Sequence, residues 1–299
     1  MSEYQTIVYS TAEQIATITL NRPDKLNAAN DELLEEFVMA IDEAEADDDV
    51  RVIIVCGNGR VFCAGADLSQ GNGAFTSAQK KDLGNSIYLP DGSVDYSHPG
   101  VRDRAGPVSL RLFRCLKPVI AAVHGAAVGV GATMLLAMDV RFAANDTRLG
   151  FVFTRRGIVP EGASTWFLQR LVGLTKSLEW CISGRFVSAH EALECGLFKS
   201  LHTLDDLLPA AHAYARDIIE NTSPVAVGLT KQMILHMAGA DHPMEAHRLE
   251  SRGVFCRAQS EDAKEGVRSF LEKDTPNFPD RISRDMPDYF PWWKEPEYF

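Results

Sequence analysis

Two glycine-containing stretches could present backbone N–H groups to an anionic oxygen. The first is Val61–Leu68, VFCAGADL, and the second is Lys117–Val140, KPVIAAVHGAAVGVGATMLLAMDV. In each, a short apolar segment turns at glycine, and in the second the pattern predicts an apolar helix over Ala132–Met138. The first amides of such a helix have no partner within it and favour negative charge nearby. If the two turns converge, they would form an oxyanion hole with two donors.

The two stretches together resemble the signatures of the enoyl-CoA hydratase/isomerase (crotonase) family. The first signature corresponds to Phe62–Leu68 and the second to His124–Thr133, and the likeness extends from about Tyr4 to about Phe278. The resemblance implies an α/β fold, the crotonase (ClpP-like) spiral of β-β-α units with an all-helical C-terminal trimerisation region. It also implies an acyl-CoA substrate, no permanently bound cofactor, no metal, and an oxyanion hole made by the amides of Ala66 and Val130.

The acid–base residues decide the reaction, and here the chain departs from the usual hydratases. Addition of water to a double bond is best served by two carboxylates. In typical hydratases these two residues occupy positions that correspond to Thr133 and Phe153, and neither side chain is a general base. Glu161 is the replacement candidate, because some isomerases of the family place their single Glu in a Pro-Glu-Gly turn like that of Pro160–Gly162.

A single carboxylate can remove a proton from one carbon of an acyl thioester and return it to another without using water. We therefore expect isomerisation of a 3-enoyl-CoA to the 2-enoyl form, with Glu161 as the proton shuttle. Three alternatives stay open. The first is hydration of a 2-enoyl-CoA that uses Glu161, and the second is a non-catalytic acyl-CoA-binding protein in which Glu161 is only a helix first-turn carboxylate. The third is a carbon–carbon hydrolase that relies on His124.

The same resemblance implies which residues bind coenzyme A. Those near its ribose-phosphate, adenine and pantetheine would be Lys25, Leu26, Ala64, Ala66, Asp67 and Leu68. Phe270 and Lys273 correspond to a C-terminal helix that often reaches the site from a neighbouring subunit. Because members of the family usually form trimers or dimers of trimers, we expect a homo-oligomer of this kind.

Charge and composition exclude several classes of partner. The net charge is −11 and the isoelectric point is near 5.2, which disfavours nucleic acid and anionic membrane surfaces. The six cysteines form no C-x-x-C pair, and Met1–Ser10 lacks the basic start and apolar run of a signal peptide, so we expect a cytoplasmic protein with reduced thiols. The long uncharged run Pro118–Met138 contains His124 and three glycines, which favours a buried strand–turn–helix over a membrane span.

The elements that must position these residues follow from hydrophobic periodicity. Strands are expected at Thr6–Tyr9, Ile15–Leu20, Val52–Val55, Val119–Val123, Arg141–Ala143, Arg148–Phe153 and Phe198–Leu201. Helices are expected at Asp31–Ala46 with Asn30 as N-cap, Val108–Leu116, Ala132–Met138, Ala163–Val172, Lys176–Ser183 and Ala189–Cys195. Beyond these, the pattern is all-helical, with helices at Leu204–Ile219, Pro224–Met237, Pro243–Arg257 and Glu261–Leu271.

The shift in pattern at Leu204 divides the chain into three parts. Residues 1–203 would form the core with the coenzyme A and acyl site, residues 204–278 a helical region for oligomerisation and coenzyme A contacts, and residues 279–299 an extended aromatic tail that docks on a neighbour. The long loop Ser69–Pro107 is either a tolerated insertion or a wall of the acyl pocket. In the second case Tyr88 and Tyr96 would touch the acyl chain.

Overall fold

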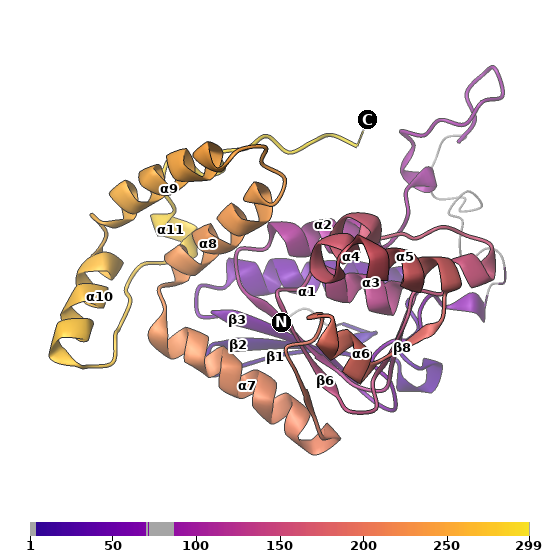
Figure 1. The fold of residues 1–299 in the computed structure, drawn as a ribbon, viewed down its shortest axis with the longest axis horizontal. Helices are drawn as coiled ribbons and strands as arrows, with labels where there is room; N and C mark the ends of the chain where they lie inside the picture. Colours follow the sequence, from indigo (N-terminus) through magenta and orange to yellow (C-terminus); the bar gives the residue numbers. More distant parts are fainter. Residues whose placement is uncertain (1–3, 70, 72–86, 299) are drawn as a thin grey trace.

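The computed structural model describes residues 4–69, 71 and 87–298, and its centre is a six-stranded sheet (Figure 1). The strand order is β1-β2-β3-β4-β6-β9, and all neighbours are parallel except β1 and β2, which form an antiparallel hairpin. The strands of this sheet are β1 (Ile7–Ala12), β2 (Ile15–Leu20), β3 (Val52–Gly57), β4 (Val119–Val123), β6 (Val140–Ala144) and β9 (Ser200–His202). A smaller sheet has the order β5-β7-β8, from β5 (Ala126–Val128), β7 (Arg148–Gly150) and β8 (Phe186–Ser188).

The large sheet is covered on both faces, which explains why β3 and β4 are almost continuously apolar. Alternate residues along β3 enter two separate apolar clusters. Ile53 and Val55 pack with the cluster that contains residues of α1 (Asp31–Ala46), whereas Ile54 packs with the cluster that contains residues of α7 (Leu204–Asn221). The helices that follow the central strands are α2 (Gly106–Arg114), α3 (Val130–Leu136), α4 (Ser164–Val172), α5 (Leu174–Ser183) and α6 (Ala189–Glu194).

Helix α7 belongs to the packed core, although the sequence pattern placed it in a separate helical region. Its buried residues Leu207, Ala211 and Ala215 recur every four positions and lie against the sheet face opposite α1 (Figure 1). The change of pattern at Leu204 therefore marks the end of strand and helix alternation and not the edge of the core. The helices that project from the sheet are α8 (Pro224–Met237), α9 (Pro243–Arg257) and α10 (Glu261–Glu272) (Figure 1).

Most expected elements are present with small shifts at their ends. The start of α1 is as predicted, because the Asn30 side chain accepts a hydrogen bond from Leu33 N at 3.1 Å. Helix α3 begins at Val130 instead of Ala132, and β7 ends at Gly150 because the chain turns into the 3-10 helix η5 (Thr154–Arg156). Strands β5 and β8 were not predicted, since three residues are too few to show a period.

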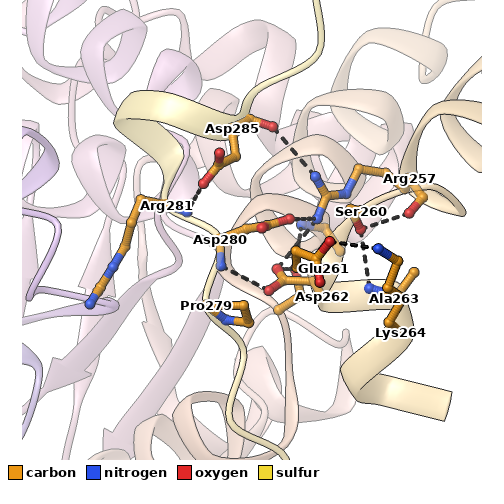
Figure 2. A network of polar contacts seen from close by, with 12 residues as sticks. Arg257, Ser260, Glu261, Asp262, Ala263, Lys264, Pro279, Asp280, Arg281 and Asp285 are labelled. Carbon is orange, nitrogen blue, oxygen red and sulfur yellow. Dashed lines mark hydrogen bonds and ion pairs between the residues drawn. The ribbon is translucent and has the colours of Figure 1, made fainter. Parts of the chain in front are cut away.

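A buried charged network joins α9 and α10 to the chain that follows them (Figure 2). Asp262, which is 2% exposed, accepts hydrogen bonds from Ser223 Oγ and from Asp280 N, and Arg257 lies 3.3 Å from its Oδ2. Arg257 also donates to Asp280 Oδ2 at 2.6 Å. The Asp262 carboxylate thus has three donors, and the Arg257 guanidinium lies between the Asp262 and Asp280 carboxylates.

The tail from residue 279 differs from the expected extended segment. It contains a short helix, α11 (Ile282–Asp285), whose turn is closed by a hydrogen bond from Arg281 N to Asp285 Oδ2. Instead of leaving the chain, the tail packs on its own α8, where the rings of His236 and Trp293 stack with centroids 3.8 Å apart. Near its end, the centroid of the Tyr298 ring lies 4.1 Å from the guanidinium carbon of Arg102.

In the part of the chain that the structure describes, no helix combines the length and apolar character that a membrane crossing requires.

Removal of the Asp262 carboxylate should destabilise the protein strongly. We expect Asp262→Ala to lower the free energy of unfolding by about 3 kcal/mol, because Arg257 would lose one buried partner and two donors would lose their acceptor. The neighbouring Glu261→Ala is the control, since Glu261 is exposed and forms an ion pair with the exposed Lys264. Urea unfolding of both variants measures the difference, and equal losses would contradict the structural role of the network.

Candidate active site

The two glycine-containing turns are held against each other by backbone contacts. Cys63 N donates to Ala126 O at 3.1 Å, and Val128 N donates to Cys63 O at 2.9 Å. At Gly131 a β-carbon would lie 2.6 Å from both Cys63 O and Cys63 Cβ, closer than real atoms approach. Glycine at 131 is therefore a condition for the two turns to meet.

Ala66 and Val130 bring one amide each to this meeting point. Val130 is the first residue of α3 and follows Gly129, whose φ of 53° is unfavourable for other residues. Neither amide donates a hydrogen bond to any residue in the described part of the chain. Both residues line the same cavity, so their N–H groups are available to an oxygen bound there.

The cavity has a volume of about 360 Å³ and a mostly apolar wall. Apolar residues that line it include Ala29, Leu34, Ala64, Leu68, Val128, Val152, Phe153, Ile158 and Val159. Its charged lining residues are Arg102, Asp103, Arg104, Arg156 and Glu161. A cavity of this size with few polar groups fits part of a small organic substrate.

Glu161 is the carboxylate that burial perturbs most clearly at this cavity. Burial raises the pKa of Glu161 to about 7, a hydrogen bond from Thr133 opposes this rise, and the negative charge of Asp103 adds to it. Thr133 Oγ1 donates to Glu161 Oε1 at 2.6 Å. A carboxyl with a pKa near neutrality can both accept and release a proton at physiological pH.

Asp103 fixes the turn on which Glu161 lies. Its Oδ1 accepts hydrogen bonds from Gly162 N at 3.0 Å and from Gly106 N at 2.6 Å. Sequence reasoning missed this residue because the loop around it has no periodicity. The signal that could have found it is an Asp placed three residues before Gly106-Pro107, where a helix N-terminus needs an acceptor.

The residues predicted to bind the cofactor moiety are only partly brought together. Ala64 and Leu68 line the cavity, and Leu26 lies beside it because its carbonyl accepts from Ala64 N at 3.0 Å. Lys25 is exposed in the 3-10 helix η1 (Pro23–Lys25). Asp67 lines a neighbouring cavity and forms an ion pair of 3.0 Å with Arg22.

Phe270 and Lys273 do not line the cavity of their own chain. They belong to the end of α10, which lies at the outer edge of the projecting helices and away from α3 (Figure 1). Tyr88 and Tyr96 are both more than half exposed and do not line the cavity either. Part of the loop predicted to form the acyl wall, residues 70 and 72–86, lies outside the described residues.

His124 does not line the cavity, as the carbon–carbon hydrolase alternative would require. Its Nε2 donates to Gly59 O at 3.0 Å, and the residue is buried without lining the cavity. The carbon–carbon hydrolase hypothesis needed this ring in the cavity and therefore has no support. Within residues 4–69, 71 and 87–298 there is also no group of three or more His, Cys, Asp or Glu side chains that could hold a metal ion.

Comparison with known proteins places the chain among acyl-CoA enzymes. A protein-family model described as enoyl-CoA hydratase/isomerase matches residues 10–88 and 100–281. The enoyl-CoA hydratase ACTT3 of Alternaria alternata is 38% identical over 272 residues, which cover 91% of this chain and 85% of that protein. The 1,2-epoxyphenylacetyl-CoA isomerase of Escherichia coli (strain K12) is 33% identical over 267 residues, with coverages of 88% and 94%.

A solved structure gives the same result. The crystal structure of a probable enoyl-CoA hydratase/isomerase from Mycobacterium abscessus superposes with a TM-score of 0.80 at 29% sequence identity. The superposition covers 91% of this chain and 98% of that chain. The α/β core and the C-terminal helices described above are therefore shared with this structure.

Replacement of Gly131 tests whether the two turns depend on their close contact. We expect Gly131→Ala to lower the free energy of unfolding by about 1–3 kcal/mol, because the new methyl group overlaps Cys63 O and must push the turns apart. Gly239→Ala is the control, since a β-carbon there meets no atom within 4 Å. Chemical denaturation of both variants checks the prediction, and an unaffected Gly131→Ala protein would rule it out.

The raised pKa of Glu161 predicts a specific dependence of stability on pH. Since the folded-state pKa is about 7 and the ordinary value is 4.5, the folded protein binds more protons than the unfolded chain between these values. Its stability should therefore fall as pH rises through this range. Glu161→Gln removes this titrating group. The free energy of unfolding of the variant, relative to that of the wild type, should therefore increase by up to about 3 kcal/mol from acidic to mildly alkaline pH.

Urea unfolding of both proteins across this pH range measures the effect. A stability difference that stays constant with pH would mean that Glu161 titrates as an ordinary exposed carboxylate.

Proposed function

This chain belongs to the enoyl-CoA hydratase/isomerase family, and from that premise we propose that it isomerises a 3-enoyl-CoA to a 2-enoyl-CoA with Glu161 as the proton carrier. The chain has the α/β crotonase fold with C-terminal helices, and its family acts on acyl-CoA substrates without a bound cofactor. The proposal concerns which reaction of the family takes place at this site.

The observation that carries the proposal is a single perturbed carboxyl in the cavity that also holds the two free amides. Ionised Glu161 removes a proton from C2 of the 3-enoyl thioester, and the electron pair moves to the thioester oxygen to give a dienolate. The amides of Ala66 and Val130 donate to that oxygen, and loss of one such donor costs on the order of 3 kcal/mol of barrier. Glu161 then returns the proton to C4, which leaves the double bond between C2 and C3.

The electrostatic environment of Glu161 suits both halves of this reaction. A base with a pKa near 7 is about half ionised at neutral pH, so it can take up a proton and release it again without a second acid. The hydrogen bond from Thr133, which lies 28 residues earlier in the chain, links Glu161 to α3. This arrangement argues against the binding-only alternative, in which Glu161 would form only local hydrogen bonds and point away from the cavity.

Hydration of a 2-enoyl-CoA is the second candidate, and Asp103 is the observation that favours it. Asp103 lines the same cavity as Glu161, and a pair of carboxylates suits the addition of water. Relatives at 38% identity carry the name enoyl-CoA hydratase. This candidate comes second because Oδ1 of Asp103 already accepts hydrogen bonds from two backbone amides, which indicates that Asp103 stabilises the turn.

We further propose that the projecting helices form a trimer or a dimer of trimers. Helices α9 and α10 expose large apolar side chains that water disfavours, among them Val254, Phe255, Phe270 and Leu271. Burial of these side chains between copies supports an oligomer. In such an assembly Phe270 and Lys273 would lie where they can contact the substrate of a neighbouring copy.

An assay with both classes of substrate tests the reaction. We expect the wild type to convert 3-enoyl-CoA into 2-enoyl-CoA and Glu161→Gln to lose about 10²- to 10⁴-fold in kcat, because the amide cannot accept the proton. The matched control is Glu220→Gln on the exposed surface of α7. Binding of coenzyme A should be retained in both variants.

Two results would contradict the proposed reaction. Hydration of 2-enoyl-CoA without isomerisation would favour the two-carboxylate reaction with Asp103. An active Glu161→Gln protein would remove Glu161 from either mechanism.

A further inference from the structure

We propose that Thr133 is a positioning residue that holds Oε1 of Glu161 and thereby assigns proton transfer to Oε2. This inference rests on the proposed function, because it concerns how Glu161 carries its proton. Thr133 is fully buried and does not line the cavity, so it acts through Glu161 and not on the substrate.

The geometry of the pair supports this role. Thr133 Oγ1 lies 2.6 Å from Glu161 Oε1, whereas Oε2 accepts no hydrogen bond from any residue that the structure describes. The turn at Gly162, with a φ of 64°, packs directly on Thr133, because a β-carbon at Gly162 would lie 3.2 Å from Thr133 Oγ1. One carboxyl oxygen is therefore engaged on the buried side, and the other is left for the cavity.

The hydroxyl of Thr133 can keep this bond in each protonation state of Glu161. A hydroxyl has one proton and two acceptor positions, and Val130 O lies 3.3 Å from Thr133 Oγ1 as a second acceptor. When Glu161 is ionised, or protonated on Oε2, Thr133 donates to Oε1. If the proton is on Oε1, the Thr133 hydroxyl oxygen can accept a hydrogen bond from it and donate its own hydrogen to Val130 O. The carboxyl group thus need not rotate between taking and returning a proton.

The other groups that face Glu161 do not replace this interaction. Asp103 is the nearby negative charge, and burial raises the pKa of the Cys63 thiol to about 11, so Cys63 is neutral. Arg104 lines the same cavity but forms an ion pair with Asp31. The hydrogen bond from Thr133 lowers the pKa of Glu161 against the effect of burial. Loss of this hydrogen bond should therefore raise the pKa of Glu161, so that the carboxyl stays protonated up to a higher pH.

Kinetics across pH test the assignment with 3-enoyl-CoA as substrate. For Thr133→Val we expect kcat to fall by about 10- to 100-fold, because the carboxyl is no longer held in one orientation. KM should stay unchanged, since Thr133 does not line the cavity. The acidic limb of the pH profile of kcat/KM should move up by about one pH unit. Thr133→Ser, which keeps the hydroxyl, should restore both kcat and the profile.

Ser109→Ala provides a matched control for the loss of a buried hydroxyl. Ser109 is fully buried, its Oγ lies 3.4 Å from the position of a β-carbon at Gly162, and it has no hydrogen-bond partner among the described residues. We expect this variant to keep the wild-type pH profile. An equal shift in Ser109→Ala and Thr133→Val would overturn the assignment, since it would reflect packing beside Gly162.

A readout that needs no catalysis separates this inference from the proposed function. The pH dependence of stability, compared with and without Glu161→Gln, reports the titration of Glu161 directly. In the Thr133→Val background its midpoint should move up by about one pH unit. A midpoint that does not move overturns the inference, even if the enzyme isomerises 3-enoyl-CoA.

Conversely, a moved midpoint in a protein inactive on 3-enoyl-CoA supports the hydrogen bond and refutes the proposed reaction. If Thr133→Val does not fold, Thr133→Ala removes the same hydroxyl without a new methyl group and gives the same two outcomes.

Discussion

The site depends on a close contact between two chain segments, where Gly131 at the start of α3 lies against Cys63. The two amides that face the cavity come from residues 64 positions apart in sequence, Ala66 and Val130, and this contact helps to bring them to one place. Hydrogen bonds between Cys63, Ala126 and Val128 fix the distance between the turns. The parallel sheet supplies the frame, because the turns that follow its strands meet at one edge. Backbone donors held this rigidly need no reorganisation when charge develops.

The second constraint is the burial of a carboxyl group beside those donors. An apolar wall makes the ionised form of Glu161 unfavourable, while Thr133 and the anchored turn at Gly162 keep it in one place. Such a group is poorly placed for stability and well placed for proton transfer. Asp103 contributes in two ways, since it anchors the turn through backbone amides and its charge raises the proton affinity of its neighbour.

Much of this arrangement could be predicted from sequence, and the exceptions share a physical cause. The strand patterns around Ile54 and the cap at Asn30 are local, so periodicity and capping rules identify them. Glu161 was expected at the site because its Pro-Glu-Gly turn resembles that of some isomerases of the family. In contrast, the burial of α7 beneath the sheet and the role of Asp103 depend on contacts between distant segments. No pattern within a short window contains that information.

The contact between Tyr298 and Arg102 bears on how specificity can diverge in this protein. Arg102 lies within the family match and lines the cavity, whereas Tyr298, whose ring packs on the Arg102 guanidinium, lies beyond the end of the match at residue 281. A substrate inferred from a relative through the matched region alone thus leaves out Tyr298, which contacts a residue of the cavity wall. A substitution at Tyr298 alters the packing on Arg102 and changes none of the groups that are proposed to carry the reaction. Selection on what enters the cavity is in this way separable from selection on the reaction itself.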